Sequence, residues 1–175
     1  LIELVVHLVR HLAVDELVIA GDLWDRGPRG DRVVDHIRDE PNVAFTWGNH
    51  DAAWLGACLG SEALIAHVLR ISVRYRRLSQ IEEGYGITMQ PVESLVRAVY
   101  GDDPAACFQP RGTGLRDPLL MARMQKALAI LQFKLVGRII ERRPDFDPAN
   151  RRPLHPPDPA KGTEEDCGQA RPLRD

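Results

Sequence analysis

Residues 17–27, LVIAGDLWDRG, and residues 43–51, VAFTWGNHD, decide the fold of this chain. In each stretch a short apolar run ends at a glycine, Gly21 or Gly48, and polar side chains follow. A short run that is apolar on both faces is typical of a parallel strand that is covered on each side. The sequence therefore predicts two buried strands, at residues 17–20 and 43–47, each followed by a polar segment.

A helix is expected between these strands, over residues 31–40, because Val33, Val34 and Ile37 have helical spacing. Asp31 suits its N-cap position, and Pro41 should end it. The order strand, helix, strand forms a right-handed βαβ unit. Ligands of open α/β sheets gather at the carboxyl ends of the strands. We therefore expect an α/β fold with a site where the two polar segments meet.

The residue types in the two segments suit metal-assisted transfer of a phosphoryl group. Asp22 could bridge two divalent cations, and Asn49 could add its amide oxygen to one of them. His50 could protonate the leaving alkoxide, while Asp25 holds its ring in one tautomer and favours the charged form. Arg26 carries a planar fork that matches phosphate oxygens. Either segment alone could be an ordinary turn or helix cap, but the pair in this order indicates a phosphoesterase site.

The two segments resemble the second and third motifs of the calcineurin-like metallophosphatases, Gly-Asp-x-x-Asp-Arg-Gly and Gly-Asn-His-Asp. Later stretches narrow the resemblance to class III (Firmicutes-type) fructose-1,6-bisphosphatase. They include Trp54-Leu55-Gly56-Ala57, Tyr85-Gly86-Ile87, Tyr100-Gly101-Asp102-Asp103-Pro104 and Arg142-Arg143-Pro144. The resemblance extends from about the first expected strand to Pro144. It implies that the two strands are part of a calcineurin-like βαβ scaffold.

The resemblance also implies a role for each polar residue. Asp22 corresponds to the bridging metal ligand, Asn49 to a ligand of the second metal, and His50 to the general acid. Asp25 corresponds to the partner that orients His50, and Arg26 to a phosphate-binding arginine. The family uses manganese to remove the 1-phosphate of fructose 1,6-bisphosphate, which gives fructose 6-phosphate in gluconeogenesis. A small sugar bisphosphate is therefore the expected partner.

Two features of the family have no match in this chain. The first motif, Asp-x-His-Gly, is absent, and the later histidine ligands have no clear counterpart. We therefore expect an internal fragment whose two-metal site is incomplete and which is inactive alone, because losing ligands removes both metal affinity and geometry.

Three parts are expected along the chain. Residues 1–51 should form part of the metallophosphatase core, with a helix over residues 1–12 packed beside the first strand. Residues 52–143 should form a large helical insertion that caps the site. It should end in a long helix that begins at Pro118 with Asp117 as its cap. Residues 144–175, which hold seven of the 13 prolines, should be truncated and poorly ordered.

Two features of the insertion leave alternatives open. Gly56 and Gly60 could allow a close helix contact or a break. Arg70, Arg74, Arg76 and Arg77 make one helix end basic, which suits a solvated helix C-terminus. The same arginines could instead contact the second phosphate of a bisphosphate, or an anionic effector. His67, among apolar neighbours, is expected to be a packed histidine.

Composition favours a cytoplasmic enzyme. The net charge of −2 over 175 residues gives no sign of a nucleic-acid or anionic-membrane partner. No apolar run has the length of a membrane span. Three cysteines without a CxxC pair favour a reduced setting, with Cys58 as a small core residue. Assembly into a homo-oligomer is left open.

Three functions remain from the sequence. The first is a sugar bisphosphatase, which the helical stretch after Asp51 favours. The second is a serine/threonine phosphoprotein phosphatase or a diadenosine polyphosphate hydrolase, which share the metal motifs. Asp51 argues against the phosphoprotein phosphatases, which usually carry Glu at that position. The third is a non-catalytic fragment.

Overall fold

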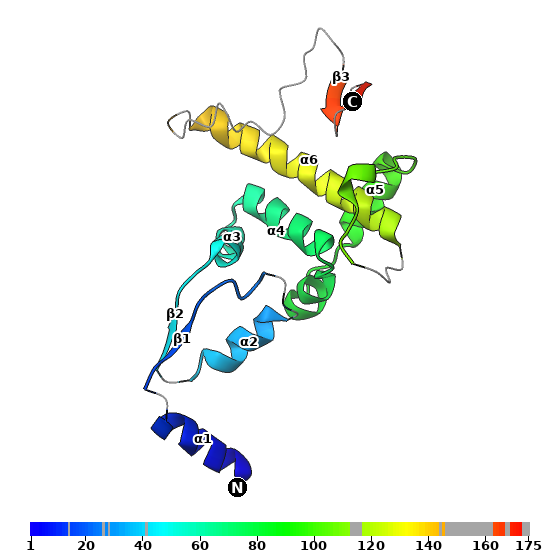
Figure 1. The fold of residues 1–175 in the computed structure, drawn as a ribbon. Coiled ribbons are helices and arrows are strands. Elements are labelled where there is room, and N and C mark those ends of the chain that lie inside the picture. Colours follow the sequence, from blue (N-terminus) through cyan, green and yellow to red (C-terminus); the bar gives the residue numbers. More distant parts are fainter. Residues whose placement is uncertain are drawn as a thin grey trace.

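The computed structural model describes residues 1–13, 15–25, 27, 29–40, 42–112, 117–143, 145, 163–166 and 169–172 (Figure 1). This part of the chain is mostly helical and contains a small parallel sheet. The elements in chain order are α1 (Ile2–Ala13), β1 (Leu17–Ile19), α2 (Gly30–Ile37), β2 (Val43–Phe45), α3 (Asn49–Cys58), α4 (Glu62–Arg74), the π-helix η1 (Gln80–Gly84), α5 (Gln90–Val99), the 3₁₀-helix η2 (Ala106–Phe108), α6 (Pro118–Arg142), β3 (Thr163–Asp166) and β4 (Gln169–Pro172).

The two expected strands pair in parallel, with Leu17 beside Val43 and Ile19 beside Phe45, and α2 lies between them in sequence. The α/β character and the order strand, helix, strand are therefore confirmed. The expectation that both strands are buried is wrong, because Val18 is 55% exposed and Phe45 46%. A strand is buried only where another layer packs on its face, and the core of the described residues lies among the helices instead.

Helix α2 begins one residue earlier than expected and without a side-chain cap. Arg29 occupies the N-cap position with a left-handed φ of 60°, and no side-chain hydrogen bond caps the helix. The Asp31 carboxylate accepts hydrogen bonds from the Arg29 guanidinium, at 3.0 Å from Nε and 2.8 Å from Nη2. Asp31 is therefore an ion-pair partner, and its assignment as the N-cap is wrong. Pro41 lies outside the described residues.

Helix α1 forms where a helix was expected, but it does not pack beside the first strand. Leu4 is 71% exposed, Leu8 58% and Leu12 78%, so its apolar side chains have little cover. Figure 1 shows α1, in dark blue, at the end of the molecule opposite the helices that carry the core. The amphipathic pattern of this segment was enough to predict the helix. It could not predict the packing, which depends on whether another part of the chain covers the apolar face.

The hydrophobic core lies among α3, α4, η1, α5 and α6. Its fully buried side chains include Val73, Ile81, Val96 and Met124. Helix α4 runs along α6 (Figure 1). Gly60, at φ 86°, separates α3 from α4, and a Cβ on Gly56 would clash with Leu64. A close helix contact and a break were the two alternatives left open for these glycines, and both occur, the contact at Gly56 and the break at Gly60.

Helix α6 is the element that the sequence predicted best. It runs from Pro118 to Arg142, and Asp117 Oδ1 accepts a hydrogen bond of 2.9 Å from the backbone N–H of Leu120. The expected cap is therefore confirmed. None of the helices in the described part of the chain is both long and apolar enough to cross a membrane.

Some features of the structure differ from expectation. Cys58 is exposed, so its assignment to the core is wrong. Cys107 is disulfide-bonded, which the spacing of the cysteines did not predict. Strands β3 and β4 form an antiparallel hairpin that was not expected, because their residues are mostly polar and show no strand periodicity. The other residues between 146 and 175 lie outside the described part, so the expected poor order stays a prediction there.

Candidate active site

Two loops meet at the carboxyl ends of β1 and β2. A Cβ on Gly21, whose φ is 86°, would lie only 2.6 Å from the backbone nitrogen of Gly48. A Cβ on Gly48 would in turn clash with the Asp22 carboxylate. Only glycine, which has no side chain, allows the two loops to approach this closely. The backbone of Gly48 therefore lies directly against the Asp22 carboxylate. The convergence expected from the βαβ order is therefore present.

Asp51 holds the two loops together through three backbone N–H groups. Its Oδ2 accepts from Asp22 at 2.5 Å and from Gly48 at 2.9 Å, and its Oδ1 accepts from Leu23 at 2.9 Å. From the sequence, Asp51 was expected only to distinguish two phosphatase families, and its structural role was not predicted. An available signal was its position three residues after Gly48, where an acidic side chain can reach back to the N-cap. Asp51 therefore fixes the backbone on which the candidate site residues stand.

The side chains of Asp25 and His50 contact each other across the two loops. His50 Nε2 lies 3.0 Å from Asp25 Oδ1, and the two side chains are 20% and 27% exposed. The backbone N–H of His50 donates to Asp22 Oδ1 at 3.1 Å. The structure thus brings Asp22, Asp25 and His50 together. Asp25 thus contacts the Nε2 end of the His50 ring.

The two predicted metal ligands are both accessible. Asp22 is exposed and has a left-handed φ of 54°, which aspartate tolerates better than most residues. Asn49 is exposed at the first position of α3. Among the described residues no group of three or more His, Cys, Asp or Glu side chains could hold a metal ion. Arg26, the predicted phosphate-binding residue, lies outside the described residues.

A pocket opens beside Asp25 and His50. It lies between the loop after β1, helices α3 and α4, and the start of η1. Its aromatic lining is Trp24 and Trp54, and its further polar lining is His67, Ser72, Arg77 and Gln80. The sequence predicted Arg77 only as a member of a basic helix end, and it gave no prediction for Ser72 or Gln80. They were missed because they lie more than 20 residues beyond Asp51, and only the folded chain brings them to the site.

His67 is packed at the edge of this pocket, as expected. Its Nδ1 lies 3.3 Å from Nε2 of Gln132, whose Oε1 accepts a hydrogen bond of 2.8 Å from Arg70. Burial lowers the pKa of His67, and the positive charge of Arg70 lowers it further. Burial also lowers the pKa of Arg70. The neutral form of His67 is therefore favoured in the folded chain.

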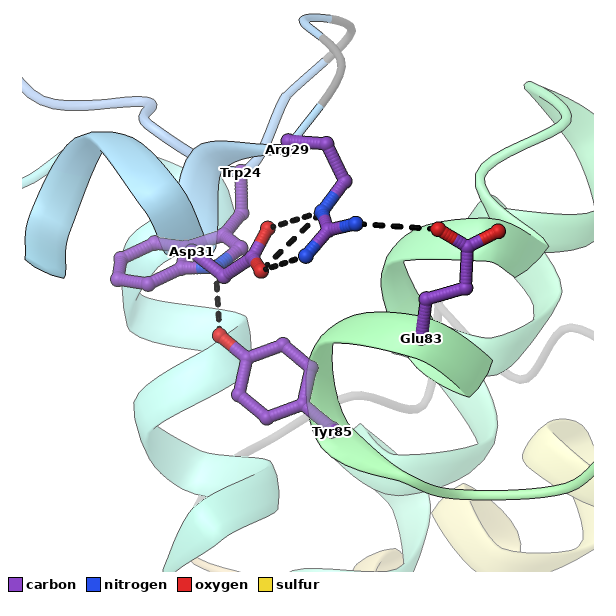
Figure 2. Close-up of polar contacts among 5 residues, drawn as sticks. All are labelled: Trp24, Arg29, Asp31, Glu83 and Tyr85. Atoms are coloured by element: carbon purple, nitrogen blue, oxygen red, sulfur yellow. Dashed lines mark hydrogen bonds and ion pairs between the residues drawn. The ribbon is translucent and has the colours of Figure 1, made fainter.

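Helix η1 clamps the loop that carries Asp25 (Figure 2). Trp24 Nε1 donates to the Tyr85 hydroxyl at 2.9 Å, and Arg29, already paired with Asp31, reaches Glu83 at 3.1 Å. The Trp54 ring lies 5.9 Å from Trp24 and 5.1 Å from Tyr85, measured between centroids. Burial raises the pKa of Tyr85. The neighbour of Asp25 is thus fixed by contacts to the helical part of the chain.

The fold and site are those of an α/β protein with a polar site at the carboxyl ends of parallel strands. Comparison with known proteins shows the family to which this chain belongs. Residues 1–175 match the family model described as Firmicute fructose-1,6-bisphosphatase. The chain belongs to this family, and the resemblance inferred from the motifs is confirmed.

Three relatives described as fructose-1,6-bisphosphatase class 3 illustrate the similarity. The protein of Listeria monocytogenes is 43% identical over 161 residues, which cover 89% of this chain and 25% of the relative. The protein of Bacteroides fragilis is 40% identical over 176 aligned positions, which cover 97% of this chain and 26% of the relative. The protein of Clostridium tetani is 43% identical over 143 residues, which cover 79% of this chain and 22% of the relative. The chain thus spans about a quarter of the length of these relatives. No solved structure matches it.

Proposed function

We propose that the whole protein hydrolyses fructose 1,6-bisphosphate to fructose 6-phosphate and phosphate, a step of gluconeogenesis, with manganese as its metal. In this proposal β1 and β2 belong to a calcineurin-like scaffold, and the helices after Asp51 are an insertion that caps the site. The observation that carries the proposal is the contact of His50 with Asp25, at 3.0 Å, beside the carboxylate of Asp22. The family membership supports the choice of substrate.

The donors in this chain suit the proposed metal but do not complete its site. Asp22 and Asn49 offer carboxylate and amide oxygens, which are suitable ligands for Mn²⁺. Since the described residues hold no larger group of metal ligands, the remaining ligands must come from outside them. When bound, a pair of divalent metals activates the attacking water and stabilises charge on the phosphoryl group. Arg26 is assigned to that phosphoryl group through the family resemblance.

We assign protonation of the leaving group to Asp25 and His50, which contact each other where the two loops meet. The Asp25 carboxylate contacts Nε2 of His50 and holds the ring in one orientation. Nδ1 then donates its proton to the sugar oxygen as the bond from that oxygen to phosphorus breaks. Protonation of the leaving oxygen prevents the release of a high-energy alkoxide. His50 is therefore the general acid, and Asp25 is its positioning residue.

Manganese-dependent phosphate release by the full-length protein tests this proposal. The substrates are fructose 1,6-bisphosphate, a phosphopeptide and a diadenosine polyphosphate. We expect preference for the sugar bisphosphate and no activity from the 175-residue chain alone. Preference for either other substrate would instead support the second function that the sequence left open.

Two histidine variants test the assignment of the general acid. His50→Asn should lower kcat by about 10²–10⁴-fold, the usual contribution of general acid catalysis. His36→Asn changes an exposed histidine on α2 and serves as the matched control. If both variants kept full activity, the role of His50 would be wrong, whatever the substrate.

A further inference from the structure

We propose that the pocket beside His50 binds the leaving group of the reaction, and that Arg77 binds the phosphate which this leaving group retains. The inference rests on the proposed function and deepens it. It assigns one end of a sugar bisphosphate to a particular side chain of the helical insertion.

The position of the pocket follows from the role of His50. A general acid must lie within hydrogen-bond reach of the oxygen that leaves. The leaving group therefore extends from His50 away from the phosphoryl group that is transferred. The pocket includes both His50 and Asp25 in its walls, and it continues toward the end of α4 and the start of η1. It is thus placed where the sugar and its second phosphate must lie.

The lining of the pocket suits a phosphorylated, hydroxyl-rich group. Arg77 Nε is buried and has no hydrogen-bond partner among the described residues. An unsatisfied buried donor costs about 1–3 kcal/mol, so a ligand that bonds it gains binding energy. A guanidinium can bind phosphate through two parallel hydrogen bonds. Ser72 and Gln80, which are 5% and 3% exposed, add polar groups that match sugar hydroxyls.

The backbone at the end of α4 directs Arg77 back toward the pocket. Arg76 has a left-handed φ of 62°, and its N–H donates to the Val73 carbonyl at 3.2 Å. The N–H of Arg77 donates to the Ser72 carbonyl at 2.6 Å. These two bonds form a Schellman motif, whose left-handed position is usually glycine. The chain therefore reverses at Arg76, and Arg77 comes to lie beside residues of the preceding turn.

The contacts of the four arginines separate their roles. Arg70 bonds Gln132, and Arg74 lies over the ring of Tyr75 at 5.9 Å. Arg76 is exposed and is not part of the pocket lining. Arg77 is the arginine of this group that lines the pocket. Of the four arginines at the basic helix end, Arg77 is therefore the one assigned to the phosphate, and the other three make other contacts.

Substrates with and without the second phosphate test the proposal in the full-length protein. Arg77→Met should lower kcat/KM for fructose 1,6-bisphosphate by about 10–150-fold, the loss expected for a hydrogen bond to a charged group. For fructose 1-phosphate, which lacks the second phosphate, the change should stay within about threefold. Arg76→Met removes the same charge beside the pocket and should leave both substrates within about threefold of the wild type.

Product inhibition gives a second readout that does not depend on the chemical step. Fructose 6-phosphate is the leaving group itself, so its inhibition constant should rise in Arg77→Met, whereas that of inorganic phosphate should not. If Arg77→Met does not fold, Arg77→Lys keeps the charge without the planar fork and should show a smaller shift in the same direction.

The possible outcomes separate this inference from the proposed function. Equal losses of Arg77→Met on both substrates, or an unchanged inhibition constant for fructose 6-phosphate, would overturn the phosphate assignment while the sugar bisphosphatase activity stands. A wild-type protein that does not hydrolyse fructose 1,6-bisphosphate would overturn the proposed function and this inference with it.

Discussion

Gly48 is the position at which one methyl group tests the geometry of the candidate site. Its φ of −93° and ψ of −176° are extended values that alanine adopts without strain. A Cβ there would lie 2.7 Å from Asp22 Oδ2, and closer still to Oδ1 and Cγ. Real Cβ atoms essentially never make contacts below 3.0 Å. Gly48→Ala must therefore displace the Asp22 carboxylate, which also bonds the backbone N–H of His50.

The size of this displacement sets the expected loss. Ordinary contact begins at 3.4 Å, so Oδ2 alone must retreat by about 0.7 Å, and the two closer atoms must move further. A misplacement of about 1 Å at a reacting centre can cost about 10²-fold in rate, and we expect a loss of kcat of that order. The overpacking should lower the free energy of unfolding by about 1–3 kcal/mol.

The assay is manganese-dependent phosphate release by the full-length protein, with thermal unfolding measured in parallel. Gly137→Ala is the matched control, because a Cβ at this position in α6 meets nothing within 4 Å. Alanine in a helix should raise stability by about 0.5–1 kcal/mol and leave activity unchanged. If Gly48→Ala kept its activity within about threefold of the wild type, Asp22 would not be a metal ligand in the position described.

Three further changes test other parts of the structure. Lys126→Met removes the partner that lies 3.0 Å from Asp103 Oδ2 in a pair whose side chains are 5% and 9% exposed. Urea unfolding should show a loss of about 3 kcal/mol, and an unchanged midpoint would contradict the buried pair. Asp117→Ala removes the α6 cap and should cost about 1 kcal/mol, seen as a lower Tm. Because the pKa of His67 is lowered on folding, the unfolded chain binds its proton first as pH falls below about 6.5, and stability should fall with it. His67→Gln should weaken this loss in unfolding curves between about pH 7 and pH 5, while above that range the two proteins should show the same pH dependence.

Local signals in the sequence predicted much of the secondary structure. Asp117 before Pro118 marks a helix start through a bond within one turn, and Gly60 marks a break through its own backbone freedom. The pairing of Asp25 with His50 was also expected, because both follow strands whose ends meet at one edge of a sheet. These inferences needed only the order of the residues and the geometry of neighbouring elements.

The features that sequence reasoning missed depend on distant partners. Aspartate is a residue type that often caps helices, but the Asp31 carboxylate bonds the charged guanidinium of Arg29, which is a stronger partner than a backbone N–H. The apolar pattern of residues 17–20 indicates a strand and not the presence of a covering layer. The hydrogen bond from Trp24 to Tyr85 joins residues 61 positions apart, and no short motif encodes it. Arg77 likewise gained its interpretation only from the pocket that it lines.

The clamp between η1 and the loop after β1 bears on how such proteins can be engineered or can diverge. Arg29 and Trp24 lie in the motif region, whereas Glu83 and Tyr85 lie in the helices that follow it (Figure 2). A transplanted loop would therefore lose its contacts to Glu83 and Tyr85, and replacing the segment that carries these two residues would remove the hydrogen bond that holds Trp24, the neighbour of Asp25. The two segments should be exchanged between homologues as one module, with substitutions at either end of the clamp accompanied by compensating changes at the other.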